Sequence, residues 1–516
     1  MDNSGISRLQ YDTLHSSITE IDHALQSVEK YLNNFKSELG QVSTEIETLQ
    51  TRSIQLNTQL DNRRNVERQL GPSVEDISIS PSVVRAVAEG PIDDNFARAL
   101  TEIEARYLNA TKEAQQLTPT KAAEDVKPLL EDLKTRAVER IRDYLVAQVK
   151  ALRSPNINVQ IIQQRNLLKH KELFPFLSRN HAQLAEEITQ AYTNTLRWYY
   201  VSSFTRYNAA LDKMQLHLID QNDLLGVDPS TKKSNTKGSI VQHDAFALGQ
   251  RGNFLKSRDN RALPSHILED TKVTHYIEVP FRNFNQVLID NLTAEYVAST
   301  ALFSANTYQQ ISRRVIPIFD PVFAMGQTLT RRLIESTTDC IGILLCIRLN
   351  QHFAFEAQKR KLPVMDDYVN YTNILLWPRL QKAMDLHCES LKKVSTATGR
   401  GAAAAFSLIG GNDASKASVA PHAITQRFGQ FLHAMLTISA DAGDDEPVAN
   451  SLSRLCGEYE NLMNKLAKNA GDTAKRGQFT CNNYNLVLTI IGDTRGKLAE
   501  DQKEYFSSLI RDLKPR

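Results

Sequence analysis

At 516 residues the chain is long enough for several hydrophobic cores in series rather than one large globule. Hydrophobic residues make up 41% and charged residues 23%, a balance that excludes a largely disordered chain. Lys and Arg total 61 against 59 Asp and Glu, so the net charge gives no reason to expect nucleic acid as a partner.

The first predicted element is a long helix with a heptad pattern. Apolar residues recur at alternating steps of three and four, which keeps them on one stripe of a helix that is buried only against other helices. Ser53 falls in this series and either sets the register of pairing or is a tolerated imperfection. The predicted partner-binding seam consists of Leu14, Ile18, Ile21, Leu25, Val28, Leu32, Phe35, Leu39, Val42, Ile46, Leu49, Leu56 and Leu60.

Gly71 and Pro72 are predicted to end this helix, and Pro81, Gly90 and Pro91 interrupt the sequence that follows. Little local sequence therefore remains to cover a helix of about 70 Å, at about 1.5 Å per residue. Partner chains are the expected cover. A helical hairpin folded back within the same chain is the alternative.

Further helices are expected downstream. The stretch after Pro91 is predicted to extend the seam through Phe96, Leu100, Ile103 and Tyr107. Apolar spacing from Leu129 to Leu152 predicts an amphipathic helix. The aromatic-rich segment from Leu167 to Asp223 predicts a bundle core, which we favour over a stacking platform for nucleic acid.

A basic segment from Pro229 to Ala262 is predicted to be a mobile linker, with contact to anionic lipid as an alternative role. Its basic residues are Lys232, Lys233, Lys237, Arg251, Lys256, Arg258 and Arg261, against Asp244 and Asp259. Helical patterns then dominate from Tyr276 to Leu498, apart from a surface loop between Thr396 and Pro421 that is rich in Gly and Ala.

The predicted fold class is all-α, with an N-terminal coiled coil followed by an elongated rod of helical bundles. The predicted parts are a coiled coil at 1–70, a broken helical connector at 71–128, a first helical bundle at 129–228, a basic flexible linker at 229–275 and a second helical bundle region at 276–516, with the loop at 396–421.

No catalytic, cofactor-binding or metal site is predicted. The twelve histidines form no HExxH pair and no zinc-ligand cluster with cysteine, and no phosphate-binding loop follows a strand. His387 and Cys388 are neighbours, but adjacent residues on a helix point about 100° apart.

Five cysteines without a CxxC pair fit a reducing cytosol. The first thirty residues lack the apolar core of a signal peptide. The longest apolar run, Ile341 to Ile347, falls short of the roughly 20 residues that cross a bilayer. We therefore expect a cytosolic chain with peripheral membrane contact only.

Several segments resemble the vacuolar-protein-sorting subunit fifty-two family of the Golgi-associated retrograde protein (GARP) complex. The clearest stretch includes Leu167-Leu168-Lys169, Phe174, Phe176-Leu177, Asn180, Glu187-Ile188, Tyr192, Thr195-Leu196 and Tyr199. Weaker ones follow in the same order at Asp223 to Val227, Leu375 to Arg379, Ile424 to Phe428 and Asn482 to Tyr484.

The resemblance implies a non-catalytic subunit of a hetero-tetrameric vesicle-tethering complex in retrograde transport from endosomes to the trans-Golgi network. It implies coiled-coil contacts with the other subunits, contacts with a Golgi Rab GTPase and SNARE proteins, and a location on the cytosolic face of the trans-Golgi network and on endosomes. Relatives are expected to continue well past the Asn482 to Tyr484 segment. The alternative is a homodimeric coiled-coil cytoskeletal or motor-adaptor protein.

Overall fold

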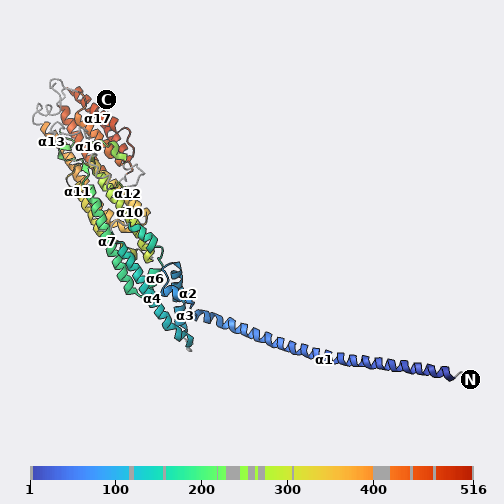
Figure 1. Cartoon of the computed structure of the whole chain (residues 1–516). Coiled ribbons are helices and arrows are strands. Elements are labelled where there is room, and N and C mark those ends of the chain that lie inside the picture. Colours follow the sequence, from blue (N-terminus) through green and yellow to red (C-terminus); the bar gives the residue numbers. More distant parts are fainter. Residues whose placement is uncertain are drawn as a thin grey trace. The chain divides into compact units, whose positions relative to one another are not determined.

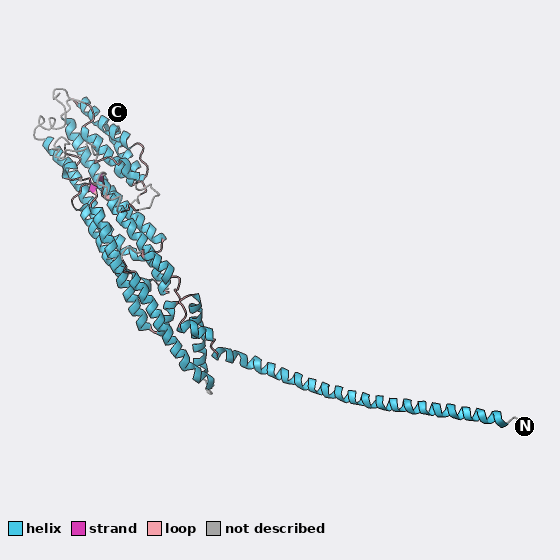
Figure 2. Cartoon of the chain, in the orientation of Figure 1, coloured by secondary structure: helices cyan, strands magenta, loops and turns pink. Residues whose placement is uncertain are grey.

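The computed structural model describes residues 4–114, 121–154, 158–217, 219–227, 245–253, 262–264, 274–304, 307–398, 419–441, 446–468 and 472–513. The chain divides into two compact units, Met1–Ala137 and Val138–Arg516, hereafter unit 1 and unit 2 (Figure 1). Helices dominate both, which confirms the all-α class (Figure 2). Within the described ranges the strands are β1 (Gln215–Leu216) and β2 (Thr274–His275), a short parallel pair.

Unit 1 begins with α1, which runs from Ser4 to Ile77 over 74 residues. The prediction that Gly71 and Pro72 end this helix is wrong, because α1 continues for another turn beyond Pro72. Proline lacks an N–H and so removes one backbone hydrogen bond. Near the end of a helix this loss affects few following residues, so the helix continues.

Two shorter helices follow, and each has a side-chain cap. In α2 (Pro81–Ala88), the hydroxyl oxygen of Ser80 accepts a hydrogen bond from the Ser82 N–H, and Pro81 occupies the first turn, where no N–H is needed. In α3 (Asp94–Ala114), an Asp93 carboxylate oxygen accepts from the N–H groups of Asn95 at 2.9 Å and Phe96 at 3.0 Å. These caps explain where both helices begin.

The apolar face of α3 does not extend an open seam as predicted. Phe96 and Ile103 are fully buried and Leu100 is nearly so, while α2 buries Val83 and Val87. Because α2 and α3 pack against each other, these residues form a local core.

The next helix, α4 (Lys121–Ala151), includes the division between the units. In its unit 1 part, the Lys134 ammonium lies 3.5 Å from the ring centroid of Tyr107 of α3.

Unit 2 by itself is elongated, and its helices pack side by side (Figure 2). Its elements are α5 (Val159–Ile162), η1 (Gln163–Leu167), α6 (Leu173–Asn180), α7 (Ala182–Asp212), η2 (Gln221–Asp223), η4 (Gly249–Gly252), α10 (Glu278–Phe303), α11 (Tyr308–Glu335), α12 (Cys340–Lys359), η5 (Pro363–Met365), α13 (Asp366–Thr398), α15 (Ala423–Ile438), α16 (Pro447–Lys468), α17 (Thr473–Ile491) and α18 (Lys497–Leu513). The predicted loop falls largely on residues 399–418, outside the described ranges.

The aromatic-rich segment is confirmed as core. Its buried rings are Phe174, Phe176, Tyr192, Tyr200 and Phe204, whereas Trp198 is 58% exposed. Phe303 of α10 packs edge-on against both Phe174 and Tyr192, with ring centroids 4.8 and 5.4 Å apart. These contacts join α6 and α7 to α10.

A second aromatic cluster holds the last four helices together. Phe428 of α15 stacks on Tyr459 of α16 with centroids 4.0 Å apart and planes 2° from parallel. Phe506 of α18 packs edge-on against both rings, and Tyr484 of α17 lies 5.8 Å from Phe506. One ring from each helix therefore meets at a common centre.

Replacing Phe428 by Ala should lower the free energy of unfolding of unit 2 by about 3–5 kcal/mol, because a fully buried ring is replaced by a cavity. Chemical denaturation followed by circular dichroism measures the change. Trp198→Ala is the control, since this ring is exposed and should change stability by about 0.5 kcal/mol or less. Equal losses in the two variants would contradict the assignment of Phe428 to the core.

Candidate coiled-coil interface

The predicted seam lies on α1, and the structure leaves all of it exposed. Every residue from Gln10 to Leu70 is exposed. The exposed fractions of the thirteen seam residues range from 46% at Leu60 to 64% at Leu49. A continuous apolar stripe of this length is unusual on a folded surface and marks a site of association. The structure brings the thirteen residues together as one stripe but does not test what covers them.

The order of the spacings assigns each residue a heptad position. Because a is followed by d after three residues and d by a after four, Leu14 occupies d. The a positions are Ile18, Leu25, Leu32, Leu39, Ile46, Ser53 and Leu60, and the d positions are Leu14, Ile21, Val28, Phe35, Val42, Leu49 and Leu56. From Ile21 to Val42 most a residues are Leu and most d residues are β-branched.

The stripe extends beyond the predicted seam in both directions. Tyr11 precedes it at an a position, and Leu70 and Val74 resume it at d and a, with exposed fractions between 56% and 70%. Arg63 and Glu67 occupy the two positions between Leu60 and Leu70. The predicted seam omits Leu70 and Val74 because it ends before the charged core positions, although counting on through those charges finds both residues.

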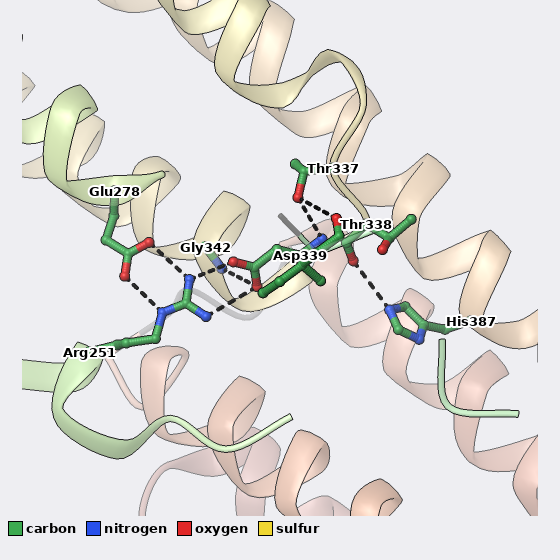
Figure 3. A network of polar contacts seen from close by, with 8 residues as sticks. Arg251, Glu278, Thr337, Thr338, Asp339, Gly342 and His387 are labelled. Atoms are coloured by element: carbon green, nitrogen blue, oxygen red, sulfur yellow. Dashed lines mark hydrogen bonds and ion pairs between the residues drawn. The ribbon is translucent and has the colours of Figure 1, made fainter. Parts of the chain in front are cut away.

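Unit 2 contains a buried ionic cluster instead of an open site (Figure 3). The Arg251 guanidinium donates to both carboxylate oxygens of Glu278, at 2.8 and 2.9 Å, and to Asp339, at 2.6 and 3.3 Å. All three residues are at most 5% exposed. The guanidinium also lies 3.9 Å from the ring centroid of Tyr276.

This cluster corrects the interpretation of the basic segment. Arg251 was counted among the solvated basic residues of the linker, yet it is buried and paired. The other six basic residues of that segment lie outside the described ranges. Arg251 therefore adds nothing to a surface for anionic lipid.

Each partner in the cluster also defines the start of a helix. Glu278 is the first residue of α10, and Asp339 caps α12, accepting from the Gly342 N–H at 3.0 Å. Burial raises the pKa of Glu278, although Arg251 opposes this effect. The cluster joins η4, α10 and α12, and its burial makes it a structural junction.

His387 and Cys388 do not form a thiol and base pair. His387 is buried, its Nδ1 accepts from the Leu225 N–H at 3.3 Å, and its Nε2 lies 3.3 Å from the Thr338 carbonyl oxygen. Burial lowers the pKa of His387 to about 4 and raises the pKa of Cys388 to about 11. The imidazole is therefore neutral at pH 7 and is engaged by the backbone on both sides.

Another buried carboxylate, Glu295, lies in the aromatic core. Its oxygens accept hydrogen bonds from Gln163 at 2.7 Å, Tyr192 at 2.9 Å, Tyr200 at 3.3 Å and Ser299 at 2.8 Å. Burial raises its pKa, while these donors lower it. Both carboxylate oxygens accept hydrogen bonds from the protein itself. We therefore interpret this network as one that fixes how η1, α7 and α10 pack against each other.

The described ranges lack two further kinds of feature, a metal-binding cluster and a membrane-spanning helix. No group of three or more His, Cys, Asp or Glu is arranged to hold a metal ion there. None of the helices in those ranges combines the length and apolar character that a membrane span requires.

The fold and the stripe together define an all-helical protein with an N-terminal coiled-coil helix. The family model described as "Vps52/Sac2 family, coiled-coil" matches residues 7–177, and "Vps52, C-terminal" matches residues 194–514. The chain belongs to the Vps52 family, which confirms the resemblance found in the sequence.

Full-length relatives agree with this assignment. Vacuolar protein sorting-associated protein 52 A of Arabidopsis thaliana is 29% identical over 98% of this chain and 71% of its own length. The Homo sapiens homolog is 30% identical over 96% of this chain and 66% of its own length. The Schizosaccharomyces pombe protein is 28% identical over 99% of this chain and 97% of its own length, so the expectation that relatives continue well past the matched region does not hold for it.

Among solved structures, S. cerevisiae Exo70 aligns with a TM-score of 0.34 at 11% identity, covering 84% of this chain and 80% of that chain. We draw no conclusion from a similarity of this size.

Replacing Arg251 by Ala should destabilise unit 2 by about 3–5 kcal/mol at pH 7.5, since it leaves two buried carboxylates without a cation. Without Arg251, burial alone acts on the Glu278 carboxyl group and holds its folded-state pKa above that of the unfolded chain. Stability is lost as the pH rises through that interval, so the deficit should shrink towards pH 4.5, the ordinary pKa of Glu. Denaturant unfolding at the two pH values measures this.

The control is Arg332→Ala, which removes an exposed ion pair with Asp212 and should cost about 1 kcal/mol or less at either pH. A deficit of Arg251→Ala that stays constant with pH would contradict the ionic origin of its effect.

Proposed function

We propose that the chain is a non-catalytic subunit of a multisubunit vesicle-tethering complex in retrograde transport from endosomes to the trans-Golgi network. The observation that carries this proposal is the exposed heptad stripe of α1, through which the chain would join its partner subunits. Membership of the Vps52 family supports it, because the relatives from Arabidopsis thaliana and Schizosaccharomyces pombe are named for vacuolar protein sorting.

The seam favours assembly with more than one partner helix. Leu at a combined with Ile at d shifts coiled coils from dimers towards trimers and tetramers. Ile21 at d beside Leu25 at a follows this pattern, and Val28 and Val42 at d beside Leu32 and Leu39 are β-branched like Ile. This favours the hetero-tetramer implied by the family resemblance over the homodimeric cytoskeletal or motor-adaptor protein.

The proposed mechanism requires no chemistry. The seam fixes the subunit to a hub, the helical bundles of unit 2 project from it, and several weak contacts act together because one assembly holds them. Those contacts would include a Golgi Rab GTPase and SNARE proteins, with no nucleic acid and only peripheral attachment to the membrane. The expected location is the cytosol, the cytosolic face of the trans-Golgi network and endosomes.

Replacing Leu25, Leu32 and Leu39 by Glu should release the chain from its partners, because each change places a charge in a desolvated seam. Light scattering of the purified chain, alone and co-expressed with candidate coiled-coil partners, measures the mass of the assembly. We expect a defined one-to-one-to-one-to-one particle with the unchanged chain and none with the variant.

The control variant adds the same three charges beside the seam, at Gln26→Glu, Asn33→Glu and Gln41→Glu, and should assemble normally. Retained assembly of the seam variant would overturn the proposal. A stable homodimer of the unchanged chain without partners would favour the adaptor alternative instead.

A further inference from the structure

The positions that flank the seam carry an uneven charge. Residues at e and g border the a and d stripe of a coiled coil, where their charges influence which helix pairs and in which orientation. In α1 the e positions are His15, Asp22, Glu29, Lys36, Ser43, Gln50 and Asn57, and the g positions are Ser17, Ala24, Tyr31, Glu38, Glu45, Arg52 and Gln59. Acidic residues therefore number four against two basic ones, and all four lie between Asp22 and Glu45.

These acidic side chains are available to a partner. All are exposed on α1, and none forms an ion pair among the described residues. Asp22 accepts a hydrogen bond from the neutral side chain of Gln26 at 3.3 Å. The helix also places no Lys or Arg four residues beyond Asp22, Glu29, Glu38 or Glu45, so the usual pairing along the helix surface does not neutralise them.

A second copy of α1 does not supply the missing charges. In a parallel, in-register pair, each g residue faces the e residue of the next heptad in the other helix. Glu38 would face Ser43, Glu45 would face Gln50, and Tyr31 would face Lys36. No such pair joins opposite charges anywhere along the seam, so the flanks give two identical helices no attraction in this parallel, in-register arrangement.

We infer that the stripe of α1 selects a different chain, whose helix presents Lys or Arg opposite Asp22, Glu29, Glu38 and Glu45. This inference rests on the proposed function and adds the chemistry of the partner to it. The apolar a and d residues provide the affinity for a partner helix, and the acidic flanking residues determine which helix is preferred.

The test measures the affinity of the full chain for two synthetic helices as long as the seam. Both helices carry Leu at a and Ile at d, and they differ in having Lys or Glu at every e and g position. Fluorescence anisotropy of the labelled helix gives the affinity. We expect the full chain to bind the Lys helix at least about tenfold more tightly than the Glu helix, since four weak flanking pairs act together.

Two variants assign this preference to the flanks. The first variant should bind the Glu helix more tightly than the Lys helix. It combines four substitutions in one chain: Asp22→Lys, Glu29→Lys, Glu38→Lys and Glu45→Lys. The control reverses four acidic residues at the outer b and c positions, Asp12→Lys, Glu20→Lys, Glu47→Lys and Asp61→Lys, and should keep the original preference with the same net charge. The preference should also shrink in about 1 M salt, where the Debye length is only about 3 Å.

The outcomes separate the inference from the proposed function. Equal affinity for the two helices, or the same reversal in the outer control, would overturn the inference while leaving the seam as an interface. Binding of neither helix would count against the seam itself, and so against both.

Discussion

The organisation of this protein depends on one constraint, the burial of the apolar stripe of α1. A single helix hides at most part of its own surface, and a 74-residue helix with exposed Leu, Ile and Val along one side is stable in water only against other helices. Its backbone is helical throughout, but its apolar side chains are not buried. The N-terminal part of the chain is therefore built for assembly, and its stability depends on the concentration and identity of its partners.

Unit 2 differs from α1, because its buried carboxylates are paired or hydrogen-bonded within the unit. Arg251 is neutralised by Glu278 and Asp339, and Glu295 receives four hydrogen bonds from its neighbours. Buried ionic groups of this kind contribute little net stability compared with apolar packing, but they penalise any arrangement that separates them. Both networks join helices that are distant in sequence. They therefore help to fix which helices of unit 2 lie together.

Sequence periodicity predicted what depends on near neighbours and missed what depends on distant ones. The heptads, the helical bundles and the aromatic core all follow from residues a few positions apart, and the structure contains them. Phe96 and Ile103 show the same spacing as the seam, yet α2 covers their helix. Arg251 looked solvated because its partners lie 27 and 88 residues away. The packing of helices that are distant in sequence decides which basic residue becomes buried. A local sequence pattern does not predict that packing.

The two parts of the α1 surface act on different properties of an assembly. A seam of Leu, Ile and Val pairs well with almost any other apolar seam, so it gives affinity with little selectivity. Selectivity comes from polar or charged groups that raise the free energy of a complex with an unsuitable partner. The helix α1 carries such groups at core positions and at flanking positions. Arg63, Glu67 and Ser53 lie at core positions, where a misaligned partner would have to desolvate them against apolar side chains. The acidic flanks repel a partner of the same charge along the middle of the seam. In the proposed assembly the core would restrict the register and the flanks would restrict the partner, so that one long helix would specify both how it pairs and with which chain.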